Sequence, residues 1–193
     1  MAADREGRQR QRRLSALKRI LERNCRTMGN VIGLFTSAAP GERMRAHLSV
    51  RALAGYGLEG DRYARGQGSY SRLEPPVARH VSLIRSEDIE VANKELMRRG
   101  LVPFSADETR RNIVVEGVDV YALLGQEFRI GDVCLRGSDP TRPCRIPSAV
   151  AGKAEFREAY HGRGGIRAEV LSDGVISIGD VLAAAARVSQ IGG

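Results

Sequence analysis

The feature that most constrains this fold is a series of short apolar segments, each bounded by glycine, proline or aspartate, that begins at Val31 and continues through most of the chain. Segments rich in valine and isoleucine are typical of β-strands, and the turn residues between them interrupt both strands and helices. The sequence therefore predicts a mainly β core. The predicted strands are 31–35, 80–84, 113–115, 127–130, 133–136, 166–171 and 175–178.

A few helices and tight turns complete this expectation. Ser86 is a suitable N-cap for a helix that carries Glu87 and Asp88 in its first turn and ends at 98–100, where two arginines precede a glycine. A weaker pattern predicts a second helix over 149–160. We expect both helices to cap the open ends of a β-barrel. The Gly-Asp pairs at 131–132 and 179–180 predict two tight turns, and the alternative for the first is a functional loop.

Length and cysteine content indicate one cytoplasmic domain. The chain has 193 residues and three cysteines without a CxxC pair, which argues against a disulfide framework or a structural zinc site. No apolar run approaches the roughly 20 residues that span a bilayer, so we expect no membrane partner. The single domain is predicted to cover 28–193.

The net charge of +8 is concentrated in residues 1–27, which hold nine Lys or Arg and three acids. The rest of the chain has 31 − 9 = 22 basic and 23 − 3 = 20 acidic residues, an ordinary balance of +2. We interpret 1–27 as a basic arm that is either disordered or a start-site artefact, with Met28 as the true start. Because the charge lies outside the domain, nucleic acid is a disfavoured partner.

Cys144 is the strongest candidate for a reactive atom. It follows Pro143 and lies between Arg142 and Arg145. Proline fixes the local backbone, and neighbouring cations favour the thiolate, which is the nucleophilic and metal-binding form of cysteine. The alternative is that Cys144 is a small buried apolar residue.

Three further motifs place arginine, asparagine or glycine at strand ends. The pair Asp61-Arg62 lies between glycines in a long loop, 110–112 reads Arg-Arg-Asn before a strand, and 162–165 reads Gly-Arg-Gly-Gly. Guanidinium groups and exposed backbone amides suit an anionic ligand. The alternatives are a local salt bridge, a solvated rim and a flexible turn, respectively. His80 and His161 lack metal-ligand spacing and are interpreted as hydrogen-bonding residues.

The order of these motifs resembles the MOSC domain, the module named after the C-terminal part of molybdenum cofactor sulfurases. The resemblance covers 57–62, 79–84, 110–117, 125–131, 142–144 and 163–180, within about 28–182. It implies a closed β-barrel related to the barrel domain of pyruvate kinase, and a ligand in the form of the molybdenum cofactor, a phosphorylated pterin. Pyridoxal phosphate enters only by family association, since no lysine lies in a recognisable setting for it.

The resemblance also implies roles for individual residues. Cys144 matches the cysteine that coordinates molybdenum or carries sulfur as a persulfide, and is the candidate catalytic and metal-binding residue. Arg62, Arg110 and Asn112 match positions that hold the pterin and its phosphate, and Arg163, Gly164 and Gly165 are expected to line the same pocket. Two positions depart from the family pattern, with Tyr63 where relatives often have histidine and Thr141 near the position of a second cysteine.

Three functions follow as hypotheses. The first is a cofactor-dependent oxidoreductase that reduces N-hydroxylated compounds, or a sulfurtransferase-like protein, working with a separate reductase or cysteine desulfurase. The second is a non-catalytic carrier of the cofactor. The third is nucleic-acid binding through the basic arm.

Overall fold

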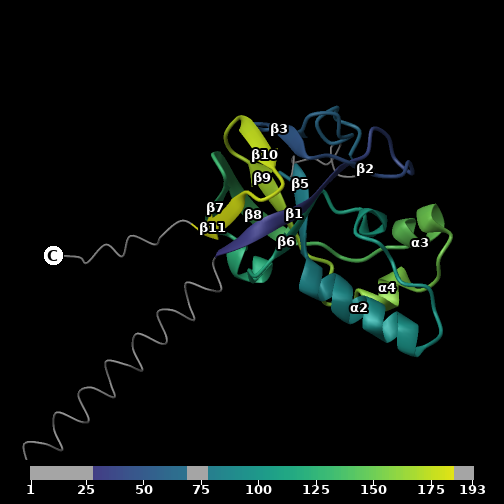
Figure 1. The fold of residues 1–193 in the computed structure, drawn as a ribbon. Coiled ribbons are helices and arrows are strands. Elements are labelled where there is room, and N and C mark those ends of the chain that lie inside the picture. The colour runs from purple at the N-terminus through teal and green to yellow at the C-terminus, as the bar shows by residue number, and fades with distance from the viewer. Residues whose placement is uncertain (1–27, 69–77, 185–193) are drawn as a thin grey trace, which may run out of the picture.

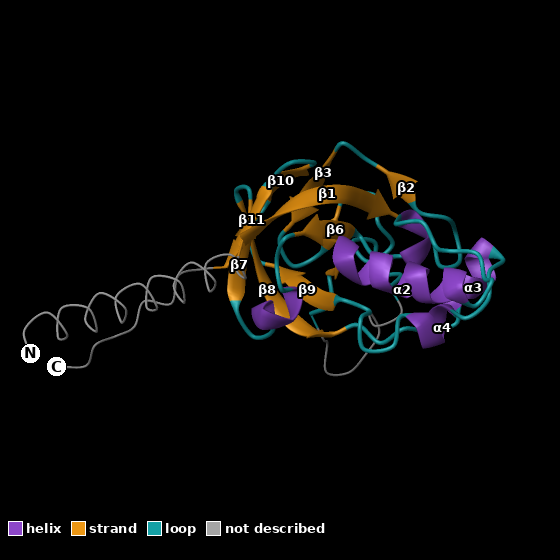
Figure 2. Ribbon diagram, turned by 60° about the horizontal axis from the view of Figure 1, so that its bottom comes forward, coloured by secondary structure: helices purple, strands orange, loops and turns teal. Residues whose placement is uncertain are grey.

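The structure is a computed structural model that describes residues 28–68 and 78–184. Its centre is a closed β-barrel of seven strands in the order β1-β11-β7-β8-β9-β5-β6, with β6 pairing back to β1 (Figures 1 and 2). The barrel strands are β1 (Met28–Thr36), β5 (Val81–Arg85), β6 (Ile113–Glu116), β7 (Glu127–Ile130), β8 (Val133–Pro140), β9 (Ile166–Val170) and β11 (Val181–Ala184). The predicted β-barrel is confirmed.

The remaining strands form the rim and a small second sheet. Strand β2 (Arg45–Ala46) pairs with the end of β1, and β10 (Gly174–Ser177), β3 (Ser49–Leu53) and β4 (Gly57–Leu58) form a three-stranded sheet. Sequence patterns did not predict β2, β3, β4 or β11. Two of these strands have only two residues, which is too short for a periodic signal.

The two Gly-Asp turns lie side by side. Residues 131–132 connect β7 to β8 in a two-residue hairpin, with Ile130 opposite Val133, which confirms the first predicted turn. In the second turn the Asp180 amide bonds back to the Ser177 carbonyl at 3.1 Å. The Gly131 amide donates to the Val181 carbonyl at 3.1 Å, so the two turns close one end of the barrel together.

Strands β5 and β6 separate two apolar cores. Leu83 and Ile113 point into the barrel, where η2 (Val120–Leu123) adds further apolar side chains. Ile84 and Val114 point outward and pack with helix residues and the aromatic group Phe104, Phe156 and Tyr160. This arrangement corrects the expectation that helices cap the barrel ends, because α2 (Ser86–Arg98) lies against the outer wall of β5 and β6 and α4 (Phe156–Ala159) packs against α2 (Figure 2).

The first predicted helix is confirmed as α2 (Ser86–Arg98), but its cap is not. Strand β5 passes directly into the helix, so Arg85 occupies the N-cap position and Ser86 is already helical, without a capping side-chain bond. The Arg85 guanidinium instead binds the Asp88 carboxylate through two hydrogen bonds of 3.0 and 2.7 Å. The first turn is therefore held by an ion pair.

The second predicted helix, over 149–160, is wrong as a single element. The structure has two short helices, α3 (Ile146–Ala151) and α4 (Phe156–Ala159). Gly152 ends α3 in the left-handed region at φ 66°, and Glu155 enters α4 at the same φ. A left-handed residue breaks the helical hydrogen-bond ladder, which explains the interruption. The short helix η1 (Asp107–Thr109) lies beside α3.

None of the helices within 28–68 and 78–184 is long and apolar enough to span a bilayer. The predicted basic arm, 1–27, lies outside the described residues, as does the end of the predicted domain, 185–193.

Candidate functional site

The loop after β4 is anchored by a buried carboxylate. Asp61 is fully buried, and its oxygens accept the backbone amides of Ser37 and Tyr63, each at 3.0 Å. The Arg62 guanidinium is 4.0 Å away, at the limit of an ion pair. The local Asp-Arg salt bridge is thus a weak contact, and Asp61 chiefly orders the loop backbone.

Asn112 joins this loop to the barrel. Its Oδ1 accepts the backbone amide and the hydroxyl of Ser82 at 3.1 and 2.9 Å, and its Nδ2 donates to the Phe35 carbonyl and to Asp61, both at 3.1 Å. An amide has two donors and two acceptor lone pairs, so all four are used. The role of Asn112 as a ligand contact stays a prediction, and the geometry gives it a positioning task.

Arg62 and Arg110 face one another across the loop. Arg62 Nη1 is buried and has no hydrogen-bond partner within 28–68 and 78–184, while its guanidinium carbon lies 5.1 Å from the centre of the Tyr63 ring. Arg110 adopts φ 59°, unusual outside glycine, and donates to the Glu42 carbonyl. Burial, followed by the charge of Arg62, lowers the pKa of Arg110. The Asp61 carboxylate opposes this shift, so both guanidinium groups lie within electrostatic reach of Asp61.

Arg111 is an additional functional candidate. It belongs to the Arg-Arg-Asn motif at 110–112, from which only Arg110 and Asn112 were predicted as site residues. Only 6% of this residue is exposed, and it donates to the Gly164 carbonyl at 2.7 Å and the Thr109 carbonyl at 3.1 Å. Burial, with the charge of Arg167 second, lowers its pKa to about 10, which leaves it charged at neutral pH. The sequence did contain one signal for Arg111, since this residue directly precedes Asn112 and a strand of apolar residues.

The glycines after α4 permit close packing and give backbone contacts to the cysteine segment. A Cβ on Gly164 would lie 2.2 Å from the Thr141 carbonyl oxygen, and one on Gly165 would lie 1.9 Å from the Leu83 carbonyl oxygen. The Thr141 amide donates to the Gly165 carbonyl at 2.8 Å. These contacts hold 141–144 against 162–165, so both glycines are required by packing alone.

The Arg163 side chain is directed to the end of helix α4, where it donates to the Ala159 carbonyl at 2.8 Å. No contact connects it to the other site arginines within the described part of the chain. Its place in the pocket stays a prediction.

Cys144 is exposed in the segment between β8 and α3. This position corrects the alternative that it is a buried apolar residue. The charge of Cys144 opposes the lowering of the pKa values of Arg110 and Arg111, so both guanidinium groups lie within its electrostatic reach. Thr141 Oγ1, three residues before Cys144, and the Tyr160 hydroxyl are buried without hydrogen-bond partners among the described residues. Burial raises the pKa of Tyr160, and the charge of Arg111 opposes this shift.

His80 is a hydrogen-bonding residue, as the sequence predicted. The Nδ1 of His80 accepts the Val170 amide at 3.0 Å, which places the proton of the neutral ring on Nε2. Burial lowers the pKa of His80, partly opposed by the Glu169 carboxylate. His161 is exposed. Across residues 28–68 and 78–184 there is no group of three or more His, Cys, Asp or Glu side chains arranged for a metal ion.

Comparisons with known proteins agree with this architecture. A profile of the MOSC domain matches residues 71–183. The solved structure of the YuaD protein from Bacillus subtilis is similar with a TM-score of 0.66 at 17% identity, covering 80% of this chain and 94% of that one. YiiM from Escherichia coli gives 0.59 at 19% identity, covering 84% and 72%. YiiM from Geobacillus stearothermophilus gives 0.56 at 18% identity, covering 84% and 77%. No curated protein matches the chain.

Proposed function

Because the chain belongs to the MOSC domain family, we propose that it binds the molybdenum cofactor at the arginine cluster beside Cys144. The observation that carries this proposal is an excess of buried positive charge. Arg62, Arg110 and Arg111 are largely buried, and Asp61 already accepts three hydrogen bonds. Burying cations without partners is costly, so an anionic ligand would stabilise this arrangement.

The polar atoms without partners fit such a ligand. Arg62 Nη1 can donate to a phosphate or pterin oxygen, and the Thr141 hydroxyl can donate or accept. The exposed Cys144 thiolate is a soft donor that suits molybdenum. Arg110 and Arg111 would supply positive charge to the bound anion. When bound, the cofactor supplies a metal centre that can change its oxidation state.

We favour Cys144 as a metal ligand over Cys144 as a link in a thiol relay. Cys134 lies near the start of β8, and Cys144 lies beyond its end at Pro140. A strand rises about 3.3 Å per residue, so the six residues from Cys134 to Pro140 span about 20 Å. A disulfide requires Cα atoms within about 7 Å of each other, so the strand holds Cys134 away from the end that leads to Cys144. Thr141, which replaces a second cysteine of some relatives, offers a hydroxyl in place of a thiol.

The proposed reaction class is reduction of N-hydroxylated compounds, with electrons from a separate reductase. A non-catalytic cofactor carrier is the competing function. Both require Cys144 and the arginines, and they differ in whether the metal spectrum changes when an N-hydroxylated substrate is added. Sulfur transfer, with a cysteine desulfurase as donor, would instead require a persulfide on Cys144.

The test is elemental analysis with pterin fluorescence after oxidation, on protein from a host that makes the cofactor. We expect near-stoichiometric molybdenum and pterin in the unchanged protein, and loss of molybdenum in Cys144→Ser, which is nearly isosteric. Cys134→Ser is the matched control and should retain both. If Cys144→Ser kept the molybdenum of the unchanged protein, the assignment of the metal ligand would be wrong.

A further inference from the structure

The surface around Cys144 combines an accessible thiol with apolar and cationic side chains. Cys144 is exposed, and Ile146, two residues on at the start of α3, is 47% exposed. Arg142 and Arg145 flank the thiol and are exposed, as is Arg157 on α4. We refer to these five residues as the thiol face.

The three arginines of the thiol face are unpaired. Their guanidinium groups make no ion pair or hydrogen bond with any residue in 28–68 or 78–184. Some exposed arginines elsewhere are paired, since Arg98 pairs with Glu95 beside it on α2, and Arg136 on β8 pairs with Glu127 at 2.7 Å. Others among the described residues, namely Arg43, Arg45, Arg51 and Arg65, are unpaired as the three here are, but they do not flank a thiol. The positive charge of the thiol face is therefore not neutralised within the described structure.

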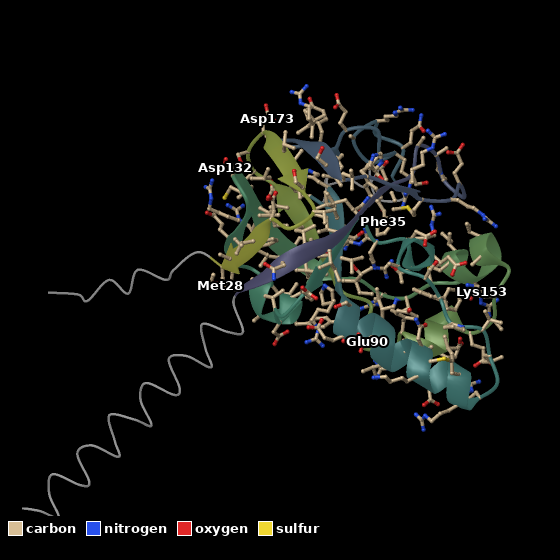
Figure 3. The ribbon with its side chains drawn as sticks, in the orientation of Figure 1. Met28, Phe35, Glu90, Asp132, Lys153 and Asp173 are labelled. Atoms are coloured by element: carbon tan, nitrogen blue, oxygen red, sulfur yellow. The ribbon has the colours of Figure 1, made fainter. Side chains whose placement is uncertain are left out.

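A hollow between α3 and α4 extends this surface away from the thiol. It has a volume of about 430 Å³, and its walls include Arg145 and Arg157. Lys153 and Glu155 also line it, but they are paired with Glu108 and Arg99. Figure 3 labels Lys153 beside these helices, far from Asp132 and Asp173 on the opposite part of the barrel. Glu158 is the remaining acid of the hollow.

We propose that the thiol face is the docking surface for an acidic protein that acts at the Cys144 centre. This inference rests on the proposed function, because it requires chemistry at Cys144. Complementary charge speeds protein association and selects the partner. The exposed Ile146, next to Arg145 in the chain, adds an apolar side chain to these charges, and protein interfaces combine apolar and charged side chains.

The same features argue for a protein in preference to nucleic acid. The unpaired arginines are arranged around an aliphatic side chain and a thiol, and the thiol face has no aromatic side chain for base stacking. Glu158, exposed on α4, would repel a continuous phosphate backbone, whereas a protein can place a cation there.

The probes for the test are three five-residue peptides, each with a central cysteine activated as a 2-thiopyridyl disulfide and flanked by four glutamates, four glutamines or four lysines. The protein is the full chain with Cys25→Ser and Cys134→Ser, made in a host without the cofactor. The Cys144 thiolate attacks the peptide sulfur, the bond to the thiopyridyl sulfur breaks, and pyridine-2-thione leaves with the electron pair and takes a proton from solvent. Its absorbance reports the rate.

We expect the glutamate peptide to react about tenfold faster than the lysine peptide at low salt, with the ratio approaching one as salt screens the charges. Arg145→Gln with Arg157→Gln should reduce the ratio at least threefold. The control Arg129→Gln with Arg136→Gln, on the distant strands β7 and β8, should leave it unchanged.

Two results would overturn the docking surface. One is an equal rate for the glutamate and lysine peptides at low salt. The other is an unchanged ratio of glutamate-peptide to lysine-peptide rates in Arg145→Gln with Arg157→Gln, because the buried arginines alone would then attract the acidic peptide. Protection of Cys144 by a DNA duplex without any preference for the glutamate peptide would assign the surface to nucleic acid, and would also overturn it.

The proposed function is judged separately, from molybdenum and pterin in the same variants made in a host that supplies the cofactor. We expect Arg145→Gln with Arg157→Gln to retain both, because these side chains lie outside the buried arginine cluster. If the protein contained no molybdenum but still reacted faster with the glutamate peptide than with the lysine peptide, the docking surface would stand and the cofactor assignment would be rejected.

Discussion

The Asn112 Nδ2 lies 3.1 Å from the Asp61 carboxylate, and both side chains are buried, so a residue at a strand entrance holds in place a loop that is 51 positions away in sequence. The same amide contacts β5 through Ser82 and the end of β1 through Phe35. This contact sets the position of Arg62, which directly follows Asp61. Four predictions follow from this geometry and its neighbours.

Asn112→Ala should reduce the free energy of unfolding by about 2–4 kcal/mol, because it leaves several buried polar groups without partners at about 1–3 kcal/mol each. Asp61 would lose a donor while remaining charged. Urea denaturation of the protein without cofactor measures the effect. Asn30→Ala, at an exposed position on β1, is the control and should change stability by less than about 0.5 kcal/mol. Equal effects of the two substitutions would contradict the positioning role.

Gly165→Ala should be far more destabilising than Gly162→Ala. Both glycines have positive φ, 83° and 72°, so both substitutions carry a conformational cost of about 1–2 kcal/mol. Only the Cβ at Gly165 meets backbone, 1.9 Å from the Leu83 carbonyl oxygen, whereas nothing lies within 4 Å at Gly162. We expect a difference in unfolding free energy above about 2 kcal/mol, measured by urea denaturation. Similar values would mean that the loop moves away from β5 without cost.

Arg111→Met should separate stability from cofactor binding. The buried guanidinium has no carboxylate within ion-pair distance in the described residues, so its replacement by an apolar side chain removes a desolvation cost while two hydrogen bonds are lost. We expect the stability of the cofactor-free protein to change by less than about 2 kcal/mol and the pterin content to fall severalfold. Arg111→Lys, which keeps the charge, should retain more pterin. Full pterin in Arg111→Met would remove Arg111 from the site.

We expect the free energy of unfolding to fall in mild acid because of His80. Burial lowers its pKa in the folded state below the ordinary value of 6.5, so the unfolded chain binds the proton more readily. Neutral His80 makes its full contribution to the free energy of unfolding above pH 6.5. This contribution is lost as the pH falls toward the lowered pKa of the folded state. Protonation would also remove the Nδ1 acceptor for the Val170 amide.

Denaturation curves between pH 8 and 5 measure this effect. His80→Gln should flatten the pH dependence of the free energy of unfolding, while His161→Gln, at an exposed position, should leave it unchanged. A profile that is equally steep in His80→Gln would assign the pH dependence to other groups.

The strands that carry periodic apolar residues were predictable, because their pattern and their turns are encoded by neighbouring residues in the sequence. Strands β7 and β8 are joined by a Gly-Asp turn and needed no distant information. The two-residue strands β2 and β4 could not be predicted, because they exist only through pairing with β1 and β3. The interruption at Gly152 was visible as a glycine, but the left-handed φ of Glu155 was not, because its ion-pair partner Arg99 lies 56 residues earlier.

The candidate site was predictable to a different degree at each residue. Cys144 stood out by its proline and arginine neighbours, and it is exposed as a reactive thiol requires. Arg62 and Arg110 lie within electrostatic reach of each other, as the effect of the Arg62 charge on the pKa of Arg110 indicates. The task of Asn112 and the burial of Arg111 depend on residues from β1, β5 and the loop after α4, which a linear motif does not specify.

The shared wall of β5 and β6 has a consequence for folding cooperativity. Leu83 belongs to the barrel core and the adjacent Ile84 to the helical core, so each strand is part of both apolar clusters. Detaching the helices would expose one side of strands that the barrel needs, and opening the barrel would remove the support of α2. We therefore expect the amides of β5 and β6 to exchange with solvent only through global unfolding. The Cys144 segment, attached to this wall through Gly165, then keeps its position for as long as the whole domain stays folded.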